Sequence, residues 1–193
     1  MKRYPLILLL LLAGCTLAEV KVEVQSERTT LENQVLGTYN ALDREMLLLA
    51  SVRGVDAQGD IREPPTQSGE QRDAVAAMQV MAFHEDDVAA FKRLNWVGEN
   101  RMGTLTAFEM DRTGTPEDLS AFARDYPAEE LEAVVAQVNE ARETLMRRVI
   151  ETNESLTDAD LDRVRRVFGR LNAENALPGE QVQTPDGTWA VAP

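Results

Sequence analysis

Residues 127–152 read PAEELEAVVAQVNEARETLMRRVIET, and this stretch predicts a long amphipathic helix. Apolar residues recur along it at spacings of three and four, which places them on one helical face. They are Leu131, Val134, Val135, Val138, Ala141, Leu145 and Val149. The other face is predicted to carry Glu129, Glu130, Glu132, Glu140, Arg142, Glu143, Arg147 and Arg148. A helix with one apolar face buries it against partners, so the stretch predicts a helical bundle.

A second long helix is predicted from Thr30 to about Arg53. Thr29 and Glu32 have the spacing of a capping box, with Thr29 as the N-cap, and Gly54 supplies a stop. Its apolar face consists of Val35, Tyr39, Leu42, Met46 and Leu49. This pattern favours a helix that faces the core of a bundle. The alternative is an oligomer seam, which would need a longer heptad run.

Shorter helical patterns fill most of the remaining chain. They cover 69–83, with Ser68 and Gln71 at its start, then 85 to about 96, 116–124 and 158–172. The last of these is capped at Thr157 and turns Leu161, Val164, Phe168 and Leu171 inward. Glycine and proline predict a loop over 54–69, and residues 98–103 form a glycine-bounded loop.

The C-terminal tail has a different pattern. Residues 181–183 and 188–191 flank Thr184-Pro185-Asp186-Gly187, which is a hairpin signal. Because an isolated hairpin is marginally stable, we expect Val182 and Trp189 to pack on the preceding helices. The predicted fold class is therefore mainly α, a small helical bundle with a short C-terminal β-hairpin.

The N-terminal residues predict export and anchoring. Lys2 and Arg3 precede an apolar run that ends in Leu12-Ala13-Gly14-Cys15, the pattern of a secretory signal peptide. Leu-Ala-Gly-Cys resembles a bacterial lipobox, which implies cleavage before Cys15 and lipidation of that cysteine. The run is too short for a membrane-spanning helix, which needs about 20 apolar residues. Thr16 after the cysteine resembles outer-membrane sorting.

The composition narrows the classes of partner. The chain has 193 residues, a net charge of −13 and one cysteine. Such an acidic chain argues against nucleic acid and against attraction to anionic lipid headgroups. We therefore expect attachment to the membrane through the N-terminal lipid, facing the periplasm. The expected organisation is a signal peptide (1–14), a tether (15–28), an N-terminal helical region (29–112) and a C-terminal helical region with the hairpin (113–193).

Four motifs in the C-terminal region occur in a fixed order. They are Asn139-x-Ala141-Arg142, Asn153-x-Ser155-Leu156, Ala176-x-Pro178-Gly179-Glu180-x-Val182-Gln183 and Gly187-x-Trp189. Together they resemble the YdbL-like family of small periplasmic proteins of unknown function, over about residues 127–191. Residues 31–37 and Gly98-Glu99 resemble the lipoprotein members of that family. The resemblance implies a protein that is not an enzyme and that is associated with large AsmA-like proteins, which bridge two membranes and move lipids.

The sequence offers little for catalysis. His84 is the only histidine, and no nucleophile elbow accompanies it, so we expect it to cap a helix or lie at the surface. A metal site lacks a His/Cys cluster, and residues 98–103 lack the Lys-Ser/Thr of a P-loop. No enzyme activity, metal or cofactor is expected.

Two functional hypotheses from different classes follow. The first is a non-catalytic lipoprotein that docks on or regulates an envelope partner, such as an AsmA-like protein. Its expected docking residues are Pro178, Gly179, Glu180, Gln183, Gly187 and Trp189. The alternative is a carrier of an acyl chain, lined by Phe83, Phe91, Trp96 and Phe108. A cell-wall binding or hydrolysing protein is a third possibility.

Overall fold

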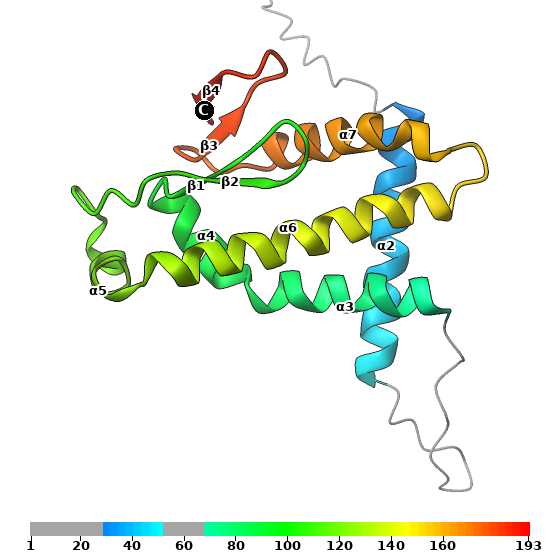
Figure 1. The fold of residues 1–193 in the computed structure, drawn as a ribbon, viewed down its shortest axis with the longest axis horizontal. Coiled ribbons are helices and arrows are strands. Elements are labelled where there is room, and N and C mark those ends of the chain that lie inside the picture. Colours follow the sequence, from blue (N-terminus) through cyan, green and yellow to red (C-terminus); the bar gives the residue numbers. More distant parts are fainter. Residues whose placement is uncertain (1–28, 52–67) are drawn as a thin grey trace, which may run out of the picture.

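The computed structural model describes residues 29–51 and 68–193 (Figure 1). The predicted signal peptide, the tether with Cys15, and the loop stop at Gly54 lie outside the described residues. Met46 and Leu49 belong to a described helix, but the structure does not describe their side chains, so their predicted inward positions stay predictions.

The described chain is mainly helical, as the sequence predicts. Its α-helices are α2 (Thr30–Ser51), α3 (Gly69–Phe83), α4 (Glu85–Arg93), α5 (Ser120–Asp125), α6 (Ala128–Glu151) and α7 (Leu161–Glu174). Short 3-10 turns, Glu117–Leu119 and Asp158–Asp160, precede α5 and α7.

The predicted helix starts are confirmed. Thr29 donates its N–H to the Glu32 carboxylate, and the Glu32 N–H donates back to Thr29 Oγ1 at 3.3 Å. Before α7, Thr157 donates both its N–H and its hydroxyl to Asp160 Oδ2, at 3.0 and 3.1 Å. Ser68 Oγ accepts from the Gln71 N–H at 3.2 Å. Each pair satisfies N–H groups that a helix start leaves without a partner.

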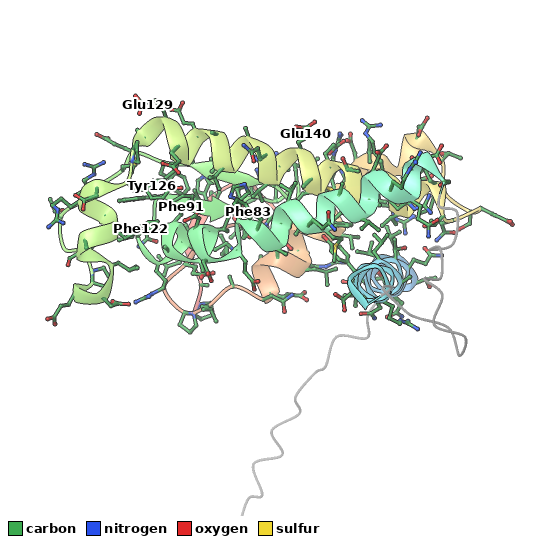
Figure 2. The ribbon with its side chains drawn as sticks, turned by 90° about the horizontal axis from the view of Figure 1, so that it is seen from below. Phe83, Phe91, Phe122, Tyr126, Glu129 and Glu140 are labelled. Carbon is green, nitrogen blue, oxygen red and sulfur yellow. The ribbon has the colours of Figure 1, made fainter. Side chains whose placement is uncertain are left out.

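Helix α6 is the axis of the molecule. α3 and α7 run along it on two sides, and α2 crosses these helices steeply (Figure 1). Figure 2 views α2 nearly end-on, which makes its crossing direction plain. The first turn of α2 lies against α7. The chain that follows the predicted tether therefore enters the domain beside α7.

The hairpin belongs to a larger sheet. Its strands, β3 (Gln181–Gln183) and β4 (Trp189–Val191), are joined by β1 (Val97–Glu99) and β2 (Leu105–Ala107) in the order β2-β1-β3-β4. β1 pairs parallel with β3, and both other pairs are antiparallel. The loop expected over residues 98–103 is therefore wrong for Gly98 and Glu99, which belong to β1.

Val182 and Trp189 lie on opposite faces of the sheet. Trp189 is opposite Gln183 and Val182 is opposite Ala190, so the pleat separates them. Val182 faces α7, whereas the Trp189 ring packs on Gly98 and meets Phe108 edge-on at 4.8 Å between centroids. The expectation that both residues pack on helices is wrong for Trp189.

Helix α6 supplies apolar residues to two separate core clusters. Its first half packs with α4, α5, β1 and β2 through Leu131, Val134, Val135 and Val138. Its second half packs with α2, α3 and α7 through Ala141, Leu145, Met146, Val149 and Ile150. The predicted apolar face is confirmed, and polar side chains fill the region where the two clusters meet. One of them is Arg142, which is 7 % exposed rather than on the outer face as expected.

Candidate functional site

Glu99 and Arg142 form the most deeply buried ion pair among the described residues. Arg142 donates from Nη1 to Glu99 Oε2 at 2.6 Å and from Nη2 to Oε1 at 2.9 Å. Lys92 Nζ of α4 lies 2.5 Å from Glu99 Oε1. Glu99 is 2 % exposed, so one carboxylate in the interior holds two cations. The two-pronged contact is the geometry that binds a carboxylate most firmly.

Further hydrogen bonds extend this cluster to α7 and β2. Asn172 Nδ2 donates to Glu99 Oε2 at 3.2 Å, and Arg142 Nη1 donates to the Gly103 carbonyl at 3.3 Å. Asn139, one turn before Arg142, accepts from the Leu105 N–H at 2.7 Å and donates to the Leu105 carbonyl at 3.0 Å. Its side-chain amide thus pairs with β2 as a neighbouring strand would. The cluster fixes the sheet to α6 and α7.

The charges of the cluster stabilise one another. Burial alone raises the pKa of the Glu99 carboxyl, but hydrogen bonds and charge from Arg142 and Lys92 outweigh burial and hold that pKa below its ordinary value. Burial raises the pKa of nearby Tyr39 to about 12. Glu99 therefore stays ionised and bonded at neutral pH. Its contacts make it a structural group, because Arg142, Lys92 and Asn172 occupy its oxygens.

The β1–β2 turn is held against α7. Asn100 Oδ1 accepts from the N–H groups of Met102 and Thr104, at 2.9 and 3.2 Å. At Gly169 of α7, an added Cβ would lie 2.3 Å from the Arg101 carbonyl oxygen. Only glycine permits this approach of helix and turn. The contact places Arg101 and Met102 beside the α7 surface.

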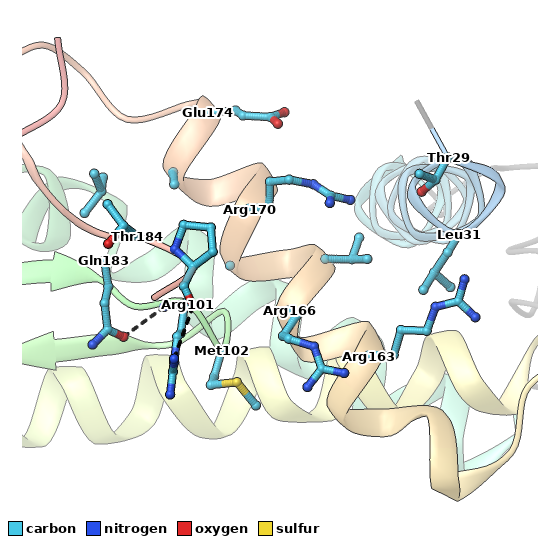
Figure 3. Close-up of a pocket in the computed structure, with 15 residues that line it drawn as sticks. Thr29, Leu31, Arg101, Met102, Arg163, Arg166, Arg170, Glu174, Gln183 and Thr184 are labelled. Carbon is cyan, nitrogen blue, oxygen red and sulfur yellow. Dashed lines mark hydrogen bonds between the residues drawn. The ribbon is translucent and has the colours of Figure 1, made fainter. Parts of the chain in front are cut away.

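A groove of about 840 Å³ lies between α7, the start of α2, the β1–β2 turn and the β3–β4 turn (Figure 3). Its lining residues are Thr29, Leu31, Arg101, Met102, Arg163, Arg166, Val167, Gly169, Arg170, Ala173, Glu174, Val182, Gln183, Thr184 and Pro185. This size lies within the range of small-molecule sites, about 300–1,000 Å³. It is the candidate binding site of the described chain.

The groove lining contrasts in charge with the whole molecule. It contains four arginines and one glutamate, in a chain whose net charge is −13. Arg163, Arg166 and Arg170 follow one face of α7, and Arg101 stands across the groove on the β1–β2 turn. The Arg101 side chain donates to the Pro185 carbonyl at 3.2 Å, which ties the two β turns together. Positive charge is therefore concentrated at this groove.

The six predicted docking residues all lie in or beside the β3–β4 hairpin, but they do not form one surface. Gly179 and Gly187 have φ of +96° and +94°, and serve the turns. Glu180 is buried and accepts from the Leu177 N–H at 3.1 Å. Pro178 is exposed before the strand, and Trp189 lies half-buried on the outer sheet face.

Gln183 alone of the six lines the groove. Its Oε1 accepts from the Arg101 N–H at 3.3 Å (Figure 3). Its Nε2 donates to the Gly187 carbonyl at 2.9 Å. It thus supports the groove wall. Its neighbours in the groove, Thr184 and Pro185, belong to the turn that the sequence predicts.

The four aromatic residues expected to line an acyl-chain cavity do not share one. Phe91 and Trp96 are fully buried in the core, whereas Phe83 is 82 % exposed (Figure 2). Phe108 packs against Trp189 on the sheet. The expected cavity lining is wrong, because Phe91 and Trp96 are packed in the core cluster that contacts the first half of α6.

His84 lies buried at the junction of α3 and α4. Its backbone N–H caps α3 by donating to the Val80 carbonyl, but its side chain makes no cap bond. Nε2 lies 2.9 Å from Gln137 Oε1, and Nδ1 lies 3.9 Å from Asp87 Oδ2. The expected cap position is confirmed for the backbone, and the alternative of a surface position is wrong. Over residues 29–51 and 68–193, no group of three or more His, Cys, Asp or Glu could hold a metal ion.

Comparisons of the chain with protein-family models, curated proteins and solved structures gave no match. The resemblance to the YdbL-like family stays a prediction from the quoted motifs. Within the part of the chain that the structure describes, no helix is long and apolar enough to cross a membrane.

Sequence reasoning missed both the buried pair and the groove. Arg142 lies four residues after Val138 and three before Leu145, which is the spacing of the apolar face. That spacing could have identified it as buried. Arg163, Arg166 and Arg170 share one helical face, a second signal visible in the sequence. Their meeting with Arg101 depends on the close contact at Gly169.

Proposed function

We propose that this chain is a non-catalytic lipoprotein of the bacterial envelope, anchored through Cys15, which acts by binding a partner in the arginine-lined groove. The observation that carries the proposal is the groove's place beside Thr29 and Leu31, at the start of the domain. The predicted tether, residues 15–28, spans at most about 50 Å when fully extended. A lipidated Cys15 would thus keep the groove within that distance of its membrane.

Three features support binding rather than catalysis. The buried carboxylate and its cations are bonded to one another, His84 is bonded to Gln137, and the described residues that line the groove include no histidine or cysteine. A groove built by two turns, a helix and a helix start is suited to selecting a ligand by shape and charge. The resemblance to the YdbL-like family favours an envelope partner, such as an AsmA-like lipid-bridge protein.

Crosslinking in cells tests this function. A photoreactive amino acid replaces Thr184 on the groove wall, and a second variant carries it at Glu129, which is exposed in the first turn of α6 and lies outside the groove. We expect a defined envelope product from position 184 and none from position 129. Identical products from both positions, or none from position 184, would overturn the proposal.

The anchor is tested separately. Cells supplied with labelled palmitate should label the wild-type chain and leave a Cys15→Ser variant unlabelled. Labelling that persists in Cys15→Ser would contradict lipidation at this residue. The crosslinking result is interpreted separately from this outcome, since the photoreactive positions, 184 and 129, lie in the folded domain and not at the anchor.

A further inference from the structure

The arginines of α7 differ sharply in their partners. Arg165 points away from the groove and pairs with Glu143 and with Asp162, the latter at 2.7 Å. Arg163 and Arg166 line the groove, and neither forms an ion pair with any described side chain. Among the described residues of so acidic a chain, two exposed arginines without an acidic partner offer a site for an anion.

The other groove arginines are held in position. Arg170 pairs with the buried Glu32 carboxylate of α2, and Arg101 is fixed by the Pro185 carbonyl. Figure 3 shows the side chains of Arg163, Arg166 and Arg170 along one side of the groove, with Arg101 and Met102 opposite. Glu174 is the one acidic residue among the described residues of the lining and lies in the last turn of α7. The positive charge therefore lies toward the start of α7.

The floor of the groove is apolar. Leu31 and Val167 are buried there, and Met102, Ala173 and Val182 are half-buried. An inorganic anion would contact only the arginines and leave the exposed parts of Met102, Ala173 and Val182 in water. An acyl chain on the floor would remove apolar surface from water, which contributes about 25 cal/mol per Å². The two kinds of lining thus suit a ligand with an anionic end and an apolar chain.

We infer that the groove binds an anionic phospholipid, its phosphate against Arg163 and Arg166 and an acyl chain along the floor toward Ala173. This inference rests on the proposed function, since it names the ligand of the same groove. Guanidinium groups bind phosphate by paired, charge-assisted hydrogen bonds, which favours phosphate over a neutral lipid. The overall acidity of the chain would repel the same lipid everywhere else.

Native mass spectrometry of the full chain, purified in nonionic detergent, tests the ligand class. Phosphatidylglycerol is titrated beside diacylglycerol, which lacks phosphate, and beside inorganic phosphate, which lacks an acyl chain. We expect one phosphatidylglycerol per chain, bound at least about tenfold more tightly than either comparator. Equal binding of diacylglycerol would overturn the role of the arginines, and equal binding of inorganic phosphate would overturn the role of the floor.

Matched variants locate the site. Arg163→Glu with Arg166→Glu should weaken phosphatidylglycerol binding about 100-fold, since each reversed arginine is expected to cost about tenfold. The control is Arg44→Glu with Arg72→Glu, which changes the net charge equally at two exposed positions outside the groove. An equal loss in both pairs would show attraction by overall charge and overturn the inference.

A third variant tests the floor. Ala173→Phe should fill the floor and weaken phosphatidylglycerol binding while the melting temperature stays near that of the wild type. If the melting temperature of Ala173→Phe falls, its weaker binding cannot be interpreted, and the inference is then tested by the Arg163→Glu, Arg166→Glu variant alone. Unchanged binding in the folded Ala173→Phe variant would exclude the acyl chain from this floor.

The crosslinking and mass-spectrometry results together distinguish a failure of the lipid inference from a failure of the proposed binding function. A protein crosslinked from Thr184, with no phospholipid retained in the mass spectra, would overturn the lipid ligand and leave the binding function standing. If the wild type retained phosphatidylglycerol and the Arg163→Glu, Arg166→Glu variant did not, the ligand class would be established even if the crosslinks identified no protein.

Discussion

Glu99→Gln is the sharpest test of how the sheet is held to the helices. The change keeps the side chain's shape and removes its charge, which leaves Arg142 buried at 7 % exposure without an ionised partner. Removing one partner of a buried pair costs about 3–5 kcal/mol. Arg142 keeps its bond to the Gly103 carbonyl, and Lys92 is 17 % exposed and can turn toward water. We therefore expect a loss near 3 kcal/mol.

Urea unfolding, followed by the fluorescence of Trp96 and Trp189, measures this loss. A loss of this kind lowers the melting temperature of a domain of this size by roughly 6–12 °C. The companion variant, Glu99→Met with Arg142→Met, removes both charges and should lose less than Glu99→Gln, because neither half of that pair is left buried alone. A loss below about 1 kcal/mol in Glu99→Gln would refute the reasoning.

The same pair predicts the acid response. The pKa of Glu99 is lower in the folded chain than in the unfolded chain, where it is about 4.3. Its contribution to stability is therefore present above that value and is lost as the pH falls through the folded pKa. The difference in unfolding free energy between wild type and Glu99→Gln should be constant near pH 7 and narrow below about pH 4. A difference that is the same at pH 7 and pH 3 would contradict this account.

Three further variants test other parts of the fold. Gly169→Ala should destabilise by about 1–3 kcal/mol in urea unfolding, because its Cβ meets the Arg101 carbonyl, whereas Gly37→Ala, with open space around it, should stabilise α2 by about 0.5–1 kcal/mol. Equal effects of the two would contradict the contact. Thr157→Ala should cost about 1 kcal/mol by loss of the capping box, and a Thr157→Ser control should retain most of it. Leu145→Ala, at 1 % exposure, should cost about 2–5 kcal/mol, and a loss under 1 kcal/mol would place it outside the core.

The helices were predictable because their signals are local. Spacing along 127–152 and the capping residues Thr29, Ser68 and Thr157 each act within one or two turns of their own helix. Turn chemistry likewise predicted the β3–β4 hairpin, where Gly187 takes a positive φ. Mainly α class with a C-terminal hairpin follows from these features alone.

The sheet and the groove depend on distant pairings. β1 and β2 are three residues each, too short for an alternating pattern to identify, and β1 pairs with β3 through Gly98 and Gln181. From the sequence alone Arg142 is predicted to be an exposed charge, because its buried partner, Glu99, comes beside it only in the folded chain. The groove likewise needs α7 and the β1–β2 turn to meet at Gly169. Each depends on the whole fold, which local patterns do not specify.

The amide of Asn139 has a consequence for how this protein avoids self-association. By pairing with Leu105 on both its N–H and its carbonyl, Asn139 occupies the outer side of β2, where another chain could otherwise add a strand. The sheet order leaves β4 as the opposite edge, and that strand is only three residues long. Pro193 follows two residues after it and has no N–H to offer. Asn139→Leu should leave the N–H and carbonyl of Leu105, which is 3 % exposed beneath α6, without these hydrogen bonds, and should lower the free energy of unfolding in urea by about 1–3 kcal/mol.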